Sequence, residues 1–283
     1  MLRHRPWHRR AGHRVALLLN RVERELARKA TAELVGTALL VAIVVGSGIF
    51  AQRLSPHDIG LQLLENSTAT GAGLIALILA FGSVSGAHFN PVVTLADRLL
   101  GGLSSAEAAI YAVAQVLGAC LGAVVANLMF GLSAVNLSTH ARSSGGVWLG
   151  EVVATFGLLM VILGVVRSGR ASAAPFAVGG YIAAAYWFTS STSFANPAVT
   201  VGRTLTDTFA GIKPSSAPAF IAAQLLGSLG AVAIARFLYP QVQAQDLIVP
   251  HEQTEPINLE PPHGRTLHPP TTASPRKGRR QRP

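Results

Sequence analysis

Two segments of the sequence pair an asparagine with a proline directly after an apolar stretch. They are Asn90-Pro91-Val92 and Asn196-Pro197-Ala198. Proline suits the first position of a helix, where no N–H partner is missed, and asparagine suits the N-cap before it. A helix N-terminus presents about half a positive charge, and an asparagine amide donates hydrogen bonds. Each segment therefore predicts a site that binds the oxygen of a neutral solute and disfavours a cation.

Two glutamates, Glu33 and Glu151, stand near the start of long apolar runs. A carboxylate is expensive inside a membrane, so such a residue indicates a functional role by default, for example in a proton relay. His88 lies two residues before Asn90, and the apolar runs contain no other histidine. This isolation favours a packed, hydrogen-bonded loop residue over a metal ligand.

The elements that position these residues are long and apolar. Half of the 283 residues are hydrophobic, 13% are charged and the mean hydropathy is +0.42, which is too apolar for a soluble domain of this length. Six windows have the length of about 20 residues that a helix needs to cross the hydrocarbon layer. They are residues 30–51, 67–87, 108–130, 147–166, 171–194 and 217–235. Because these windows lack the alternation of barrel strands, we predict an all-α membrane protein with six transmembrane helices.

The segments that follow the two Asn-Pro pairs, residues 92–100 and 198–209, are too short to cross a bilayer. We predict that each is a re-entrant half-helix. Irregular backbone at this depth is tolerated only where it is buried in protein or lines a watery cavity. The two half-helices are therefore expected to line a cavity within the helix bundle.

The two halves of the chain repeat each other. Glu33 and Glu151 are 118 residues apart, Gln115 and Gln224 are 109 apart, and the two Asn-Pro pairs are 106 apart. Each half holds three spans, an odd number, so the second half must be inserted upside down relative to the first. The N-termini of the two half-helices would then meet near the middle of the membrane.

Charge separates a membrane domain from two tails. The net charge is +10, yet 15 of the 23 Lys and Arg residues lie in the two end segments, nine in 1–30 and six in 265–282, which is not the pattern of a nucleic-acid-binding face. The predicted parts are a basic arm at 1–29, a channel domain at 30–238 with inverted repeats at about 30–130 and 147–238, and a disordered Pro-rich tail at 239–283. The basic tails predict cytoplasmic termini in a plasma-membrane protein, with the tails against anionic lipid.

Catalysis and metal binding find no support in the residue pattern. The single cysteine, Cys120, lies within an apolar run, and no nucleophile–base pair or cluster of metal ligands stands near the Asn-Pro segments. We therefore expect no enzymatic activity, no metal and no cofactor.

The run Ser85-Gly-Ala-His-Phe-Asn-Pro91, together with the second segment Asn196-Pro-Ala198, resembles the two signatures of the major intrinsic protein family of aquaporins and aquaglyceroporins. The resemblance covers about residues 30–238, with Val92 in place of the commoner alanine. It implies six tilted helices with two half-helices, assembled as a homotetramer with one pore per subunit. It also implies that Glu33 and Glu151 accept hydrogen bonds from the backbone of the re-entrant loops.

The family has a second constriction whose arginine directly follows the second Asn-Pro-Ala. Val199 occupies that place here, and ungapped counting from the two asparagines assigns the other positions to Thr70, Ala184 and Ser193. These four side chains are small and uncharged, which predicts a wide selectivity filter. In lacking the arginine, the chain is similar to bacterial members linked to arsenic resistance, which pass metalloid acids, glycerol-like solutes or methylated arsenic species.

Arg203 lies four residues beyond Val199 and therefore on nearly the same face of the half-helix. It could draw oxyanions or polar solutes into an outer vestibule. The alternative is an interfacial arginine that snorkels to the membrane surface.

The sequence thus predicts a passive channel for water and small neutral solutes. One alternative is a secondary transporter with broken helices, which would need a coupling ion that only the two glutamates could serve. Another alternative is a non-conducting structural protein built on the same fold.

Overall fold

The computed structural model describes residues 7–240, with side-chain environments from residue 21 onward. The predicted tail beyond residue 240 lies outside the described residues. Residues 7–240 contain no strand and form eight α-helices joined by short connections. The first half comprises α1 (Trp7–Leu54), α2 (Ile59–Ser85), α3 (Pro91–Leu100) and α4 (Ser105–Met129). The second half comprises α5 (Gly145–Arg167), α6 (Ala174–Phe188), α7 (Pro197–Gly202) and α8 (Ala217–Leu238), with 3-10 turns η1 (Ala171–Ala173), η2 (Arg203–Leu205) and η3 (Pro214–Ser216).

Six helices form the predicted spans, and α3 and α7 are the two half-helices. Five of the spans, α1, α2, α4, α5 and α8, are long and apolar enough by themselves to cross a membrane. The sixth, α6, has only 15 residues and extends η1. It stops at Phe188, because the chain turns there toward the second half-helix, so the predicted window to residue 194 was too long.

The first helix is also longer than its predicted window of 30–51. It begins at Trp7 and runs through most of the predicted basic arm without a break. Residues 14–35 contain neither glycine nor proline, and they are rich in Leu, Arg, Glu and Ala, which favour helix. From residue 7 onward the arm is therefore helical and continuous with the first span.

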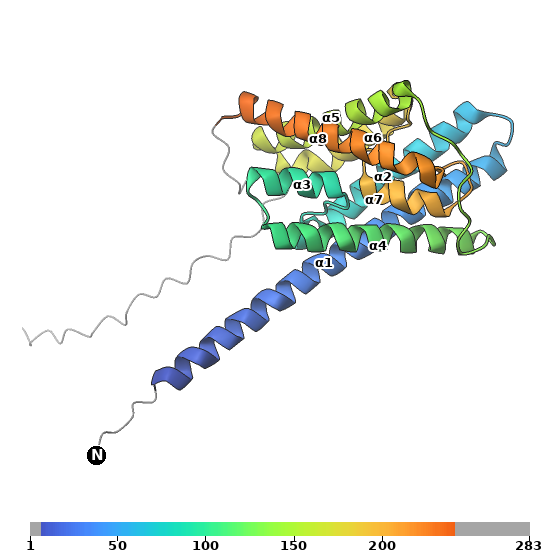
Figure 1. The fold of residues 1–283 in the computed structure, drawn as a ribbon. Helices are drawn as coiled ribbons and strands as arrows, with labels where there is room; N and C mark the ends of the chain where they lie inside the picture. Colours follow the sequence, from blue (N-terminus) through green and yellow to red (C-terminus); the bar gives the residue numbers. More distant parts are fainter. Residues whose placement is uncertain (1–6, 241–283) are drawn as a thin grey trace, which may run out of the picture. The chain divides into compact units, whose positions relative to one another are not determined.

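The packing of the helices repeats between the two halves. In the first half α1 packs against α2 and α4, and in the second half α5 packs against α6 and α8 in the same way. The halves meet where α2 packs on α6, and each half-helix contacts the last long helix of both halves. Figure 1 shows α3 and α7 between α8 and α4. The two short helices are thus enclosed by long ones, as a membrane requires for interrupted backbone.

The side of the bundle opposite the start of α1 is closed by two connections, 130–144 and 206–213, which we call the loop end. The first connection binds η2 through a backbone hydrogen bond from Asn136 N to the Leu205 carbonyl at 2.9 Å, and Lys213 N of the second connection donates to the His140 carbonyl of the first at 2.8 Å. The side chain of Asp207 accepts a further bond from Thr139 N at 2.8 Å. Connections from both halves therefore act as one cap.

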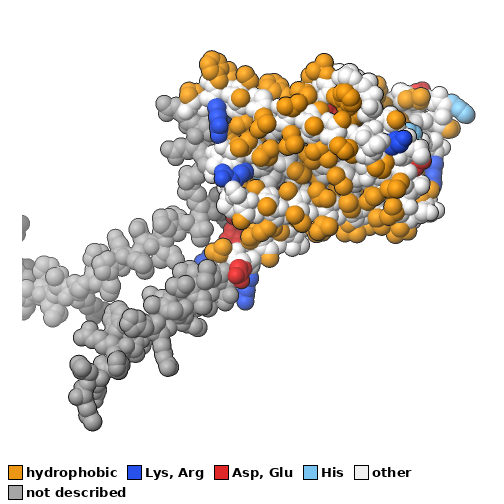
Figure 2. All heavy atoms as spheres, viewed as in Figure 1, with side chains coloured by type: hydrophobic (Ala, Val, Ile, Leu, Met, Phe, Trp, Pro, Cys, Tyr) orange, Lys and Arg blue, Asp and Glu red, His pale blue; other side chains and the backbone are white. Residues whose placement is uncertain are grey.

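The distribution of polarity is that of a membrane protein. Large apolar side chains on the outer faces are exposed, including Leu117 at 57% and Leu226 at 64%. Figure 2 shows such side chains over the flank of the bundle, with Lys and Arg near its two ends. Glu33, Gln115 and Gln224 are instead fully buried. An apolar exterior around a polar interior fits lipid on the outside.

Two glycines at equivalent places let the long helices of each half approach closely. A methyl group at Gly118 in α4 would lie 2.3 Å from the carbonyl oxygen of Leu34 in α1. A methyl group at Gly227 in α8 would lie 2.5 Å from the carbonyl oxygen of Val152 in α5. Because the obstacle in each case is backbone, the helices must move apart to admit any side chain. Small residues at such crossings are how membrane helices pack.

We expect Gly118→Ala to lower the thermal stability of the detergent-purified protein by about 1–3 kcal/mol, the usual cost of overpacking. Intrinsic helix propensity alone would favour alanine. The measurement is a melting curve followed by size-exclusion chromatography. Gly180→Ala is the matched control, because nothing lies within 4 Å of a methyl group there. Equal melting temperatures for the two variants would show that the close α1–α4 contact does not limit the thermal stability of the protein.

Candidate functional site: a pore between two half-helices

Two buried carboxylates hold the loops that lead into the half-helices. Glu33 accepts hydrogen bonds from the backbone N–H groups of His88 at 3.0 Å and Phe89 at 2.7 Å. Glu151 accepts them from Phe194 and Ala195, both at 2.9 Å. In each half these are the two residues directly before the asparagine. The glutamates thus bind the same backbone groups in both halves.

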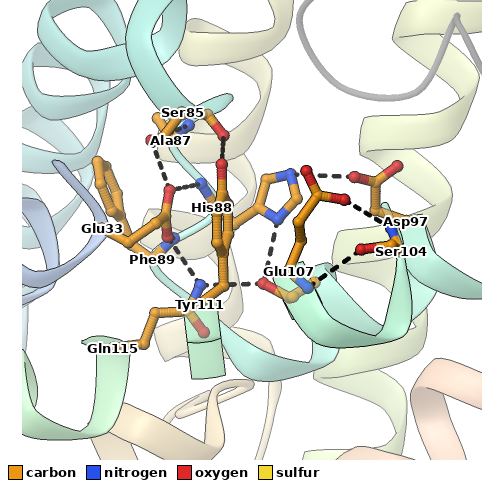
Figure 3. A network of polar contacts seen from close by, with 11 residues as sticks. Glu33, Ser85, Ala87, His88, Phe89, Asp97, Ser104, Glu107, Tyr111 and Gln115 are labelled. Atoms are coloured by element: carbon orange, nitrogen blue, oxygen red, sulfur yellow. Dashed lines mark hydrogen bonds and ion pairs between the residues drawn. The ribbon is translucent and has the colours of Figure 1, made fainter. Parts of the chain in front are cut away.

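A glutamine from the last long helix of each half completes the arrangement. Gln115 donates to the Glu33 carboxylate at 2.7 Å and to the Thr94 hydroxyl at 2.9 Å. Gln224 donates to the Glu151 carboxylate at 2.5 Å and to the Thr200 hydroxyl at 2.9 Å. The first half has an extra donor to its carboxylate, the hydroxyl of Ser85 at 2.6 Å (Figure 3). Each carboxylate therefore ties an outer helix to a half-helix and its loop.

The loops need such anchoring because their backbone is strained. Ala87 and Phe89 have φ values of 50° and 48°, and Ser193 and Ala195 have 49° and 47°. In both loops these are the positions three and one before the asparagine. A side chain in the left-handed region costs on the order of 1 kcal/mol or more. The repeat of strain at the same offsets shows that both loops follow one backbone path.

The two asparagines cap their own half-helices and join them to each other. The side-chain oxygen of Asn90 accepts from Val92 N at 3.1 Å, and that of Asn196 accepts from Ala198 N at 2.9 Å. The amide nitrogen of Asn90 donates to the Ala195 carbonyl, and that of Asn196 donates to the Phe89 carbonyl, both at 2.8 Å. Each amide has a second N–H group beyond this bond. The two capped N-termini therefore meet, as the inverted repeat predicts.

Both asparagines line a cavity inside the bundle, with a volume of about 60 Å³ open to the centre of a water-sized sphere. Along α6 the lining residues extend from Ala174 to Tyr186, twelve residues apart, which corresponds to a length of roughly 18 Å. Most of the wall is apolar side chains of α1, α2, α5 and α6. The asparagines thus place hydrogen-bond donors part-way along a largely apolar passage.

Near the loop end the lining comprises Thr70, Tyr186, Ser193, Val199 and Arg203. The hydroxyl groups of Thr70 and Tyr186 lie 3.2 Å apart and share a hydrogen bond. Three of the four predicted filter positions therefore line the same cavity. The fourth, Ala184, does not.

Ala184 was assigned by ungapped counting, and this assignment is wrong. The side chain is exposed on the outer face of α6 and is absent from the cavity wall. Val178, Ile182 and Tyr186 line the cavity at intervals of four residues, which is the spacing of one helix face. Ala184 falls between them on another face. The bulky Tyr186 therefore stands where a small alanine was expected.

Arg203 is 2% exposed and lines the cavity, so the interpretation as a snorkelling interfacial arginine is wrong. Its guanidinium carbon lies 3.4 Å from the centre of the Phe194 ring. Val199 contains no charge, yet the chain does place an arginine in the passage one helical turn further on. The burial of Arg203 was not predicted, because nothing in the sequence indicated that Phe194 would be its stacking partner.

His88 occupies a polar cluster on the side of α3 away from the loop end. Its Nδ1 lies 3.1 Å from the Thr94 hydroxyl and its Nε2 lies 3.5 Å from the Asp97 carboxylate, with the Tyr111 ring 5.5 Å away (Figure 3). The side chain is buried. Residues 21–240 contain no group of three His, Cys, Asp or Glu side chains that could hold a metal ion. Asp97 and Tyr111 were not singled out from the sequence.

Comparison with known proteins agrees with this geometry. The sequence pattern of the family described as "Major intrinsic protein" matches residues 20–193 and 173–258. The chain belongs to the major intrinsic protein family. It is 50% identical over 216 residues to aquaglyceroporin AqpS of Rhizobium meliloti (strain 1021), an alignment that covers 76% of this chain and 92% of that protein.

Two further proteins are similar to this chain at lower identity. The probable aquaporin AqpM of Archaeoglobus fulgidus is 30% identical over 241 residues, covering 75% of this chain and 97% of that protein. The crystal structure of the aquaglyceroporin from Plasmodium falciparum superposes with a TM-score of 0.59 at 20% identity, covering 76% of this chain and 98% of the other. That likeness shows the aquaporin fold. As a member of this family, the chain is a multi-pass membrane protein and a passive channel for water and small solutes, and not an enzyme.

We expect Glu33→Leu to destabilise the protein strongly and Glu33→Gln to do so less. Leucine leaves the N–H groups of His88 and Phe89 without acceptors, at about 1–3 kcal/mol each, whereas the amide oxygen of glutamine still accepts one bond. The measurement is thermal unfolding in detergent, with exposed Glu23→Gln as control. A Glu33→Gln variant that assembles and melts like the unmodified protein but conducts nothing would indicate proton-relay chemistry instead.

Proposed function

We propose that this channel facilitates passage of small neutral polyhydroxy solutes larger than water, of the glycerol type. The observation that carries the proposal is the pair of crossed asparagines, each with an N–H group beyond its bond to the opposite loop, within a largely apolar cavity. A solute with hydroxyl groups on one edge and carbon on the other fits such a wall. Its oxygens accept from the amides while its carbons contact Leu74, Ile78 and Ile162.

Electrostatics favours neutral solutes over cations. The N-termini of α3 and α7 meet at the asparagines, and each presents about half a positive charge. A cation at this point would lose its water shell and face two positive helix ends. A neutral solute loses only its hydrogen bonds to water, and bonds from the asparagine amides replace them.

The selectivity filter in this proposal consists of Thr70, Tyr186, Ser193 and Val199. Its polar members are hydroxyl groups, which both donate and accept hydrogen bonds. The relative named aquaglyceroporin AqpS supports a glycerol-sized solute. Arsenite as neutral As(OH)₃ displays hydroxyl groups as glycerol does, so metalloid and methylated arsenic acids belong to the same substrate class.

In the membrane we place the loop end outside the cell and both termini in the cytoplasm. Arg98 and Arg236 lie on the side of the bundle that holds the two termini, as does the basic arm. An excess of Lys and Arg on one side indicates the cytoplasmic side of a membrane protein. The family resemblance supports a homotetramer in the plasma membrane, with one pore in each subunit. His88 in this arrangement stabilises the loop on the cytoplasmic side, and the two glutamates are structural.

The test is light scattering by reconstituted liposomes after rapid mixing with water-only, glycerol, urea, boric acid and arsenite gradients. We expect glycerol and arsenite to equilibrate faster than in empty liposomes, in both directions, with a low activation energy. The rates should not change when a protonophore is present. Flux that needs a proton gradient would support a secondary transporter, and the absence of any flux would support a non-conducting protein.

Val199→Arg tests the filter assignment. The long arginine side chain should block a solute of the size of glycerol more than it blocks single water molecules. Glycerol flux should therefore fall about tenfold more than water flux, which corresponds to a difference in barrier height near 1.4 kcal/mol. Val199→Ala, which removes two methyl carbons, should leave glycerol flux unchanged or slightly higher. Equal losses of water and glycerol flux in the arginine variant, at unchanged protein level, would contradict a selective role for this position.

A further inference from the structure

Arg203 is the one Lys or Arg side chain among residues 21–240 that lines the cavity. It lies on η2, directly after α7, four residues beyond Val199. Four residues on a helix correspond to about one turn, so the two side chains lie on nearly the same face and roughly 6 Å apart along the axis. An arginine at this depth is costly unless it has partners and a use.

The side chain is held firmly. Its Nε donates a short hydrogen bond to the carbonyl oxygen of Ala210 in the connection 206–213. Its guanidinium stacks over the ring of Phe194, whose own backbone N–H is bound by Glu151. The Phe194 ring packs in turn on Phe220 of α8, with ring centres 5.2 Å apart. Arg203 is therefore fixed to the same scaffold that positions Asn196.

A second cation supports the same ring. The guanidinium carbon of Arg142 lies 5.1 Å from the centre of Phe194, and its Nε donates to the Gly211 carbonyl at 3.1 Å. Burial lowers the pKa of Arg142, but arginine starts high enough to stay charged. Among the described residues no carboxylate forms an ion pair with Arg142 or Arg203. Two guanidinium groups thus flank the Phe194 ring, one of them in the cavity wall, and neither forms an ion pair.

We propose that Arg203 is the arginine of this pore's filter, relocated by one helical turn from the place directly after the second Asn-Pro-Ala, with Phe194 and Arg142 holding it there. The inference rests on the proposed function, because it assigns the residue that sets its selectivity. A guanidinium has five N–H donors, and the bond to Ala210 uses one. The remaining donors bind two neighbouring oxygens of a polyol or oxyacid, and the charge repels cations.

This position reconciles an arginine with a passage for larger solutes. At position 199 a long side chain would enter the cavity that Thr70 and Tyr186 also line. At position 203 it is flattened against an aromatic ring and anchored at its Nε. The pore can then keep a multi-donor cation without losing the space that valine leaves.

The test compares Arg203→Leu with Arg53→Leu in liposomes. Arg53 is the matched control, because it also binds a carbonyl oxygen and stacks on a ring, both of Phe130, but lies outside the cavity lining. We expect Arg203→Leu to raise proton and sodium leak about tenfold or more and to lower the ratio of glycerol to water flux, whereas Arg53→Leu changes neither. An assembled Arg203→Leu variant with unchanged leak and unchanged flux ratio would overturn the proposal.

Two further variants keep the test decisive if Arg203→Leu does not assemble. Arg203→Lys retains the charge but loses the several N–H donors of the guanidinium. The proton and sodium leak should therefore stay low while the ratio of glycerol flux to water flux falls. An unchanged flux ratio overturns the proposal. The double variant Val199→Arg with Arg203→Val should restore low leak and admit water far better than glycerol. The unmodified protein in the same liposomes separates the two hypotheses, because its failure to conduct glycerol would refute the proposed function and not only the role of Arg203.

Discussion

The bond between a buried carboxylate and two consecutive backbone N–H groups is the interaction on which the pore depends. Glu33 and Glu151 each hold a loop whose residues adopt left-handed backbone angles that side chains ordinarily avoid. A buried charge is tolerated only when it is hydrogen-bonded, and here backbone and glutamine donors bind both carboxylates, with a serine hydroxyl added at Glu33. Without the carboxylates, the loops would have both strained backbone angles and buried N–H groups without acceptors.

Once the loops are held, the asparagines connect the two halves. Each one caps a half-helix with its oxygen and binds the opposite loop with one N–H, so the two halves fix each other across the middle of the bundle. The glycines at the α1–α4 and α5–α8 crossings bring the outer helices close enough for the glutamates and glutamines to reach inward. The placement of hydrogen-bond donors in the passage therefore depends on close packing of the outer helices.

The features predictable from sequence were those that repeat and those that are unusual in a membrane segment. Asn-Pro after an apolar run, a glutamate within such a run and their recurrence in the same order in both halves identified the fold and both asparagines of the lining. Ala184 was misplaced because counting along the chain assumes a helix face that only packing determines, and α6 turns Tyr186 inward. The burial of Arg203 was unpredictable because it depends on Phe194 and Ala210, which come together only through the loop. The composition of residues 14–35 favoured a helix longer than the span. The predicted window followed apolarity alone, however, so it left out the polar residues before residue 30.

The inverted repeat also gives the pore two mouths that can change separately. The seventh residue after each asparagine is Asp97 in the first half and Arg203 in the second. Asp97 lies behind His88, whereas Arg203 lines the passage itself. The bonds that hold the two loops are alike, but Asp97 lies within α3 whereas Arg203 begins η2 after the end of α7. Duplication thus supplied one frame with two independently adjustable entrances, and a new solute preference can arise at one mouth without rebuilding the other.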